Sequence, residues 1–81
     1  MIVKLLASET TLTSATNVGL ATVVRVYNSG SAATVTRKDS DGNTIGTVTL
    51  AAGEVVYLDK DSSDTLEGGA SFKAVKIAYA N

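Results

Sequence analysis

The sequence predicts an all-β fold, either a small antiparallel β-sandwich or an open barrel of about six or seven strands. Short runs rich in Val, Thr, Ile and Tyr recur along the chain, and clusters of Gly, Asn, Asp and Ser separate them. No segment is long enough to supply the crossover helix that parallel strands require. With 81 residues the chain has room for a single domain, which we expect to span residues 1–81.

The N-terminal residues 2–6, Ile-Val-Lys-Leu-Leu, predict the first strand, with alternate side chains on opposite faces. The apolar run 1–6 is far too short to span a bilayer and lacks the pattern of a signal peptide. Residues 10–13 predict a short edge strand because Thr is β-branched. Asn17 and Gly19 then indicate a turn.

Residues 21–28 give the strongest strand pattern, which we expect at the centre of the sheet. Side chains alternate with a period of two along a strand. Val24 and Val26 are therefore expected on one face, and Val23 and Tyr27 on the other.

The next two predicted strands are residues 33–38 and 44–50, joined by a hairpin turn. Gly42 follows an Asp in this turn and can hold the left-handed position of a bulged connection. A bulge at Gly46 would turn Ile45 toward the apolar face of its strand.

A further strand is predicted at residues 54–58, after the connection 51–54. Gly53 can adopt a positive φ without steric cost, so we expect this connection to be either a β-hairpin or a tight β-corner. Both alternatives place one strand before this connection and one after it, within the stretch 46–60.

The acidic segment 59–71 interrupts the strand pattern before the last predicted strand, residues 72–80. Asp64 and Glu67 have the spacing of a capping box, so one helical turn is expected around residues 65–66.

Alternation along these strands predicts both a core and a second apolar face. The expected core residues are Val24, Val26, Val35, Val48, Leu50, Val56, Leu58, Val75, Ile77 and Tyr79. The opposite faces carry the candidate interface residues Val23, Tyr27, Val55, Tyr57 and Phe72. These residues are either scattered or covered by the loop 59–71, or they form an interface with another subunit or a host surface.

Catalytic, metal and nucleic-acid sites are not expected. The chain has no His and no Cys, so imidazole catalysis and thiolate metal sites are ruled out. The turn 39–43 begins like a calcium loop, but Thr44 replaces the Gly at position six and Leu50 the Glu at position twelve. The segment 59–70 departs at the same two positions. The net charge of −1, from seven basic and eight acidic residues that are intermixed, offers no basic stripe for phosphates.

A family resemblance supplies the functional expectation. It is carried by residues 21–28, 46–60, 64–66 and 75–81. These segments resemble the short β-rich virion proteins of marine tailed phages, particularly phages that infect cyanobacteria. The resemblance covers nearly the whole chain and marks no individual site residue.

The resemblance implies a capsid decoration or cement protein that is made in the host cytoplasm and sits on the outside of the virion head. Its expected partners are the major capsid protein, whose subunits it would bridge, and other copies of itself, with a trimer favoured. Such a role needs no active site. From the residues we likewise expect no enzyme activity, no cofactor, no metal, no nucleic acid and no membrane. Two alternatives stay open: a receptor- or glycan-binding module of a fibre, using the loops 28–31 and 59–71, and a tail or neck subunit.

Overall fold

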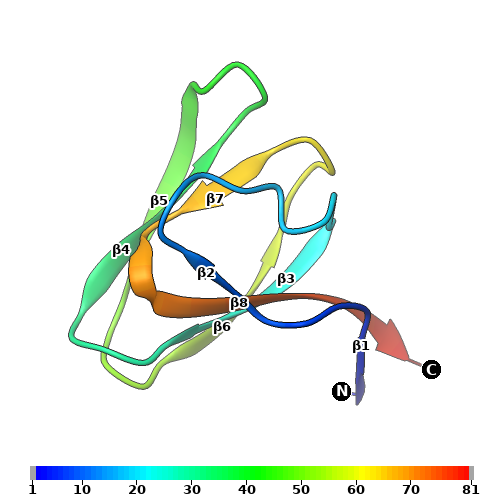
Figure 1. The fold of residues 1–81 in the computed structure, drawn as a ribbon, viewed down its shortest axis with the longest axis horizontal. Coiled ribbons are helices and arrows are strands. Elements are labelled where there is room, and N and C mark those ends of the chain that lie inside the picture. The colour runs from blue at the N-terminus through cyan, green and yellow to red at the C-terminus, as the bar shows by residue number, and fades with distance from the viewer. Residues whose placement is uncertain (1, 81) are drawn as a thin grey trace.

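The computed structural model describes residues 2–80, so Met1 and Asn81, the two ends of the expected domain, lie outside the described residues. Residues 2–80 form eight strands and no helix (Figure 1). The strands are β1 Ile2–Leu5, β2 Thr10–Leu12, β3 Val23–Asn28, β4 Ala33–Lys38, β5 Thr44–Leu50, β6 Val55–Asp59, β7 Thr65–Glu67 and β8 Gly69–Ala80. The predicted all-β fold is confirmed.

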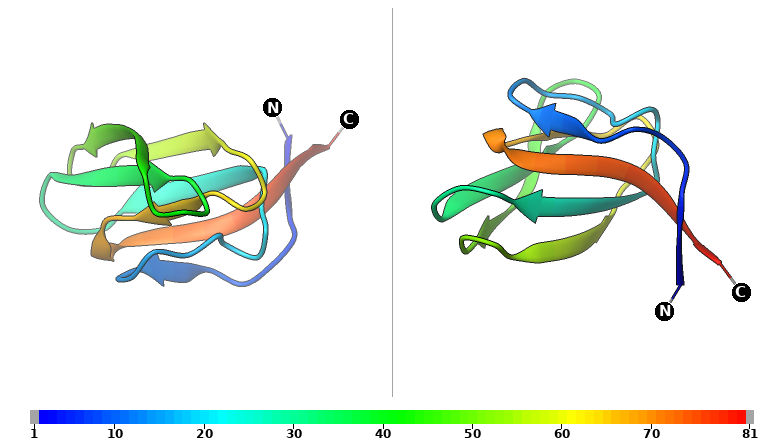
Figure 2. Two further views of the ribbon diagram at one scale, coloured as in Figure 1. Left: turned by 90° about the horizontal axis from the view of Figure 1, so that it is seen from above. Right: turned by 60° about the horizontal axis from the view of Figure 1, so that its bottom comes forward.

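All strand pairs are antiparallel, and the strands form two sheets. The larger sheet has the order β1-β8-β3-β6, and β2 pairs with a different part of β8. The smaller sheet has the order β5-β4-β7. β3 lies between β8 and β6, as predicted for a central strand. Buried side chains from both sheets meet in one core, so the domain is a small β-sandwich (Figure 2).

The two predicted connections around β5 are present, and they differ in kind. Residues 39–43 join β4 to β5 as a hairpin, with Gly42 at a φ of 88°. The connection 51–54 is a corner and not a hairpin, because β5 and β6 belong to different sheets. Gly53 has a φ of 79° there, and its N–H donates to the carbonyl oxygen of Asn28 at 2.8 Å. The corner alternative is therefore the correct one.

The core lies between the sheets and is built mainly from large aliphatic side chains and one aromatic ring. Its largest fully buried apolar side chains are Phe72, Leu12, Leu50, Leu66, Val24, Val26 and Val35. Val56 and Leu58 are partly buried and pack against this cluster, as predicted. Fully burying a side chain of this size contributes roughly 1.5–3 kcal/mol.

The inward face of β8 is the reverse of the predicted one. Phe72 and Ala74 are fully buried in the core, whereas Tyr79 is 50% exposed. Val75 and Ile77 are buried but lie on the opposite side of the strand, outside the core cluster. Both faces of this strand are apolar in the sequence, so alternation alone does not say which face turns inward.

The bulge and the burial in β5 also differ from expectation. The register between β4 and β5 skips Ile45, which places the irregularity one residue before the predicted Gly46. Ile45 and Val48 are 50% and 39% exposed, so Val48 is not the core residue that was predicted. Because β5 is an outer strand of the smaller sheet, these side chains stand at the edge of the sandwich.

The helical turn predicted around residues 65–66 is wrong, because Thr65–Glu67 is strand β7 and pairs with β4. Asp64 would have capped the helix, but its carboxylate accepts hydrogen bonds from Arg37. Glu67 accepts one from the Nζ of Lys38 at 2.7 Å. Both acidic side chains therefore accept hydrogen bonds from basic side chains of β4.

Candidate functional site

The candidate site is the side of the larger sheet that faces away from the smaller sheet, called the outer face here. The pairing of β3 with its two neighbours defines it, because directly opposed residues of antiparallel strands share a face. Tyr27 pairs with Val55 and Lys73, Arg25 pairs with Tyr57 and Val75, and Val23 pairs with Asp59. The outer face therefore comprises Val23, Arg25, Tyr27, Val55, Tyr57, Asp59, Lys73 and Val75.

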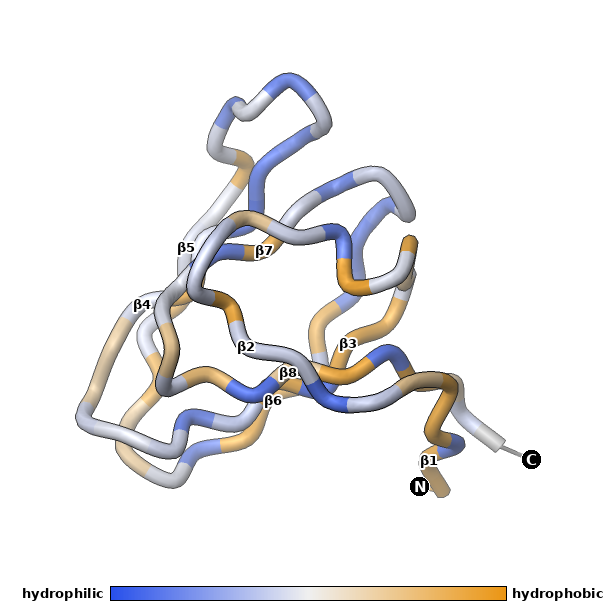
Figure 3. Tube along the Cα trace, viewed as in Figure 1, coloured by the Kyte–Doolittle hydropathy of each residue, from blue (hydrophilic) through white to orange (hydrophobic). Residues whose placement is uncertain are grey.

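Four of the five predicted interface residues come together on the outer face. Val55 and Tyr57 of β6 are 37% and 39% exposed, and Val23 and Tyr27 of β3 are half-buried between their neighbours. Figure 3 shows hydrophobic stretches along β3 and β6, and also along β1. The assignment of the fifth predicted residue, Phe72, to the interface is wrong, because Phe72 is fully buried between the sheets.

Glycine at position 68 explains how Phe72 fits in the core. A Cβ atom at Gly68 would lie 2.7 Å from the Phe72 ring and 3.0 Å from the carbonyl oxygen of Thr34. The absent side chain thus makes the space that the ring occupies. No alternation rule detects such a contact, since it depends on two residues that the fold brings together.

Arg25 stands at the centre of the outer face and gives it a polar anchor. Its Nη1 lies 3.7 Å from Oε2 of Glu9, and its guanidinium carbon lies 6.0 Å from the centre of the Tyr27 ring. A partly exposed ion pair of this kind contributes less than about 1 kcal/mol to stability. Tyr and Arg are, however, the residue types that are enriched at protein interfaces.

An apolar extension adjoins the outer face, and it was missed by the sequence interpretation. β1 pairs with the end of β8, and both project from the body of the domain (Figure 2). Leu5 is 69% exposed and pairs with Ile77, which lies on the same side of β8 as Val75. A hollow of about 500 Å³ lies between Leu5, Glu9, Arg25 and Val75. The sequence gives no signal for the exposure of Leu5, because residues 2–6 are apolar on both faces of the strand.

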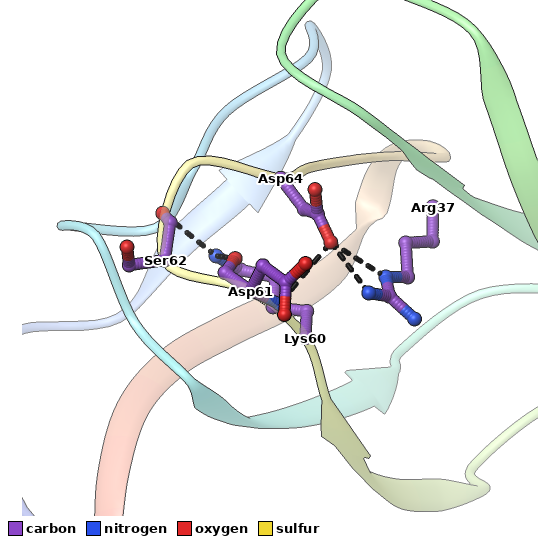
Figure 4. Close-up of polar contacts among 5 residues, drawn as sticks. All are labelled: Arg37, Lys60, Asp61, Ser62 and Asp64. Carbon is purple, nitrogen blue, oxygen red and sulfur yellow. Dashed lines mark hydrogen bonds and ion pairs between the residues drawn. The ribbon is translucent and has the colours of Figure 1, made fainter.

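The best-defined charged cluster of the domain supports a loop and does not form an open site (Figure 4). Arg37 donates from Nε to Oδ2 of Asp64 at 2.9 Å and also from Nη2, and the N–H of Asp61 donates to the same oxygen at 3.1 Å. The hydrogen bond from Arg37 holds the pKa of Asp64 below its usual value, and the same contact raises the pKa of Arg37.

Lys60 is the buried basic residue of this cluster. It is 2% exposed, and its Nζ donates to the carbonyl oxygens of Asp61 at 3.2 Å and of Ser62 at 3.4 Å. Burial lowers the pKa of this amine. Among the described residues, every buried side-chain nitrogen or oxygen has a hydrogen-bond partner. The hydrogen bonds within the cluster therefore hold the loop between β6 and β7 in place, and the polar groups of the cluster serve as partners for one another.

Among the described residues, neither acidic turn gathers three acidic side chains that could hold a metal ion. In the first turn, Oδ1 of Asp39 accepts from the backbone N–H groups of Asp41 at 3.0 Å and Asn43 at 2.9 Å. The amide of Asn43 donates to Oδ2 at 3.2 Å. These hydrogen bonds lower the pKa of Asp39, and the bond from the N–H of Asn43 has the largest effect. Turn geometry thus explains the acidic residues that imitate a calcium loop.

The fold and the outer face define a small antiparallel β-sandwich with a partly exposed, largely apolar sheet surface. No protein-family model, curated protein or solved structure matches this chain. Within residues 2–80 no helix has the length and apolar character needed to cross a bilayer. What the outer face offers is a surface for contact, with aromatic rings, a central guanidinium and few other charges.

Proposed function

We propose that this chain is a virion structural protein, a decoration or cement protein that binds the exterior of a phage capsid through its outer face. The observation that carries the proposal is that Val23, Tyr27, Val55 and Tyr57 gather on one sheet surface, on which the side chains of Val55 and Tyr57 are exposed. The resemblance to virion proteins of marine tailed phages supplies the partner, the major capsid protein.

The size of the outer face supports attachment to a repeated lattice more than a tight complex with one partner. Three strands about 4.8 Å apart, with three residue pairs about 6.8 Å apart, cover on the order of 300 Å². A stable pair of proteins buries about 800 Å² on each partner. A single contact of this size is weak, but many equivalent contacts on a symmetric shell, or a second contact between linked copies, raise the occupancy.

The composition of the outer face also fits an interface. Tyr27 and Tyr57 provide large, rigid contact area with polar ends, and Arg25 provides hydrogen-bond donors at the centre. Asp59 and Lys73 stand on the two flanking strands, so charges are few and lie at opposite corners. Apart from the central Arg25, the middle of the face is apolar and its charges lie at the corners, a distribution that is typical of protein contacts.

Binding to empty heads tests the proposal. The purified chain is mixed with empty heads of the tailed phage that encodes it, and bound protein is measured by co-sedimentation. We expect saturable binding that Tyr27→Ser with Tyr57→Ser weakens by about 30-fold or more, at about 1 kcal/mol for each truncated ring. Leu20→Ser is the control, because Leu20 is 58% exposed and lies in the loop before β3.

Two results would contradict the proposal. One is binding to heads that the double Tyr variant leaves unchanged although its circular dichroism matches the parent. The other is binding to members of a glycan panel without binding to heads, which is the result expected for a fibre module. Cryo-microscopy of the virion locates the chain directly and separates a head protein from a tail or neck subunit.

A further inference from the structure

The free edge of β5 is a second surface without a partner, on the opposite sheet from the outer face. β5 is hydrogen-bonded to β4 only. The other edge of this sheet is covered, because Thr16 and Leu66 of β7 exchange backbone hydrogen bonds of 3.1 and 2.9 Å. Residues 44–49 are all exposed. The unpaired N–H and C=O groups of such an edge are a template for another strand.

β5 lacks the usual chemical protection of an edge strand. Its sequence, Thr-Ile-Gly-Thr-Val-Thr-Leu, contains no charged residue and no Pro. Charged side chains, Pro and bulges are the devices that natural edges use against pairing. The one device present is the bulge at Ile45, which leaves the five residues 46–50 in regular register with β4.

A cleft opens between the two sheets next to β5. It has a volume of about 180 Å³ and is lined mainly by apolar side chains: Val35, Arg37, Gly46, Thr47, Val48, Leu58 and Leu66. Leu58 belongs to β6, the edge strand of the larger sheet, so the cleft lies between the two sheets, next to their edge strands β5 and β6. A Cβ atom at Gly46 would meet no other atom within 4 Å, which shows that this side of β5 has room.

We propose that β5 pairs with β5 of a second copy of this chain, antiparallel and about a two-fold axis at Thr47. A two-fold axis pairs each strand with an identical strand that runs in the opposite direction. Any charged residue of the strand would then occur on both strands of the pair, and the like charges would repel each other. β5 has no charge to repeat. With the axis at Thr47, Val48 of each copy stands beside Gly46 of the other, on the side of the cleft, and enters the room that Gly46 leaves.

The pairing explains the edge and the cleft together. The two three-stranded sheets become one six-stranded sheet, and the exposed Val48 of each copy is covered at the same time as the cleft beside it. The outer face belongs to the other sheet and stays free. The assembly is two-fold, in contrast to the trimer favoured for the expected capsid role. The pairing requires no capsid, so an experiment can refute it without refuting the proposed function, and the reverse also holds.

Sedimentation equilibrium of the purified full chain, from micromolar to millimolar concentration, tests the pairing. We expect twice the mass of one chain at high concentration. Val48→Lys should leave a monomer over the whole range, because it places a charge in the closed cleft. The control Val55→Lys adds the same charge to the exposed outer face, and this variant should still dimerise. Circular dichroism and thermal melting verify that both variants are folded.

Cross-linking gives a second, independent readout. The chain has no Cys, so a single introduced Cys can only bridge two copies. Directly opposed residues across antiparallel strands lie about 4.5–5.5 Å apart, within the range of a disulfide. Thr47→Cys should therefore oxidise rapidly to a covalent dimer, and Thr34→Cys, one strand further from the edge, should not.

Three results would overturn the pairing. They are a monomer at every concentration, a trimer, and a dimer that Val48→Lys leaves intact while Thr47→Cys forms no cross-link. If Val48→Lys fails to fold, the cross-link decides alone.

Discussion

Removing the side-chain amide of Asn28 should destabilise the domain more than any other polar truncation that leaves the charges intact. Asn28 is fully buried at the end of β3. Its Nδ2 donates to the carbonyl oxygens of Ser31 at 2.9 Å and Leu50 at 3.0 Å, with a longer contact of 3.3 Å to Ala51. Its Oδ1 accepts from the N–H of Gly30 at 3.0 Å. The amide therefore links the turn after β3 to the end of β5 in the other sheet.

The magnitude follows from these contacts. Asn28→Ala removes three good hydrogen bonds, and at about 1 kcal/mol each their loss amounts to about 3 kcal/mol. We expect the full loss because the variant leaves a buried carbonyl without its partner. At about 0.05–0.15 kcal/mol per residue, a domain of this length has on the order of 4–12 kcal/mol of total stability. The loss should lower the midpoint of thermal unfolding by about 12–24 °C.

Urea unfolding monitored by circular dichroism measures this loss against a matched control. Asn43→Ala removes the same atoms from an exposed turn, where the amide donates to Asp39 at 3.2 Å. We expect that control to lose less than about 1 kcal/mol. Equal losses in the two variants, or a loss below about 1 kcal/mol for Asn28→Ala, would refute the reasoning that burial of the amide decides its contribution.

Other predictions follow from the corrected packing and from the charged cluster. The lowered pKa of Asp64 contributes stability that is complete above the unfolded pKa of about 3.9 and is lost as the pH falls through the folded pKa. Asp64→Asn should therefore lower stability at pH 7 and flatten its dependence on pH between 2 and 5 in acid titrations followed by circular dichroism; an unchanged slope would contradict this. Phe72→Ala should lose about 3–5 kcal/mol in urea unfolding, as for other buried aromatic residues, whereas an interface role would predict a loss of binding at normal stability. Gly53→Ala should lose about 1–2 kcal/mol through its positive φ, and Gly53→Asn should lose less, because Asn tolerates this conformation. Gly68→Ala should lose more than Gly53→Ala through contact with the Phe72 ring, and Asn should not rescue it; thermal melts of the four Gly variants check both statements.

Much of the secondary structure could be predicted because it depends on local properties. β4 has the predicted bounds, since a β-branched run sits between two turn clusters. In β3, alternation placed Val24 and Val26 inward correctly, because charge and polarity fall on the other face of that strand. The positive φ at Gly42 and Gly53 was expected for the same local reason.

The candidate site could be predicted only in part. Val23, Tyr27, Val55 and Tyr57 follow from the alternation of two strands that are neighbours in the sheet. Phe72 was assigned to this face because β8 is apolar on both sides, and the space beside Gly68 that its ring fills in the core is not visible in the local pattern. The exposed ribbon of β1 and the end of β8 depends on a pairing between the two ends of the chain.

The sequence by itself determined where most of the strands and turns lie, because backbone preference and side-chain alternation act over a few residues. Only the tertiary structure decided which face of β8 turns inward, that Asp64 and Glu67 bind the cations of β4 and leave no helix, and that β5 ends its sheet with a free edge. Each of these outcomes depends on residues far apart in the chain that compete for the same space or the same hydrogen-bond partner, and no local pattern contains that competition.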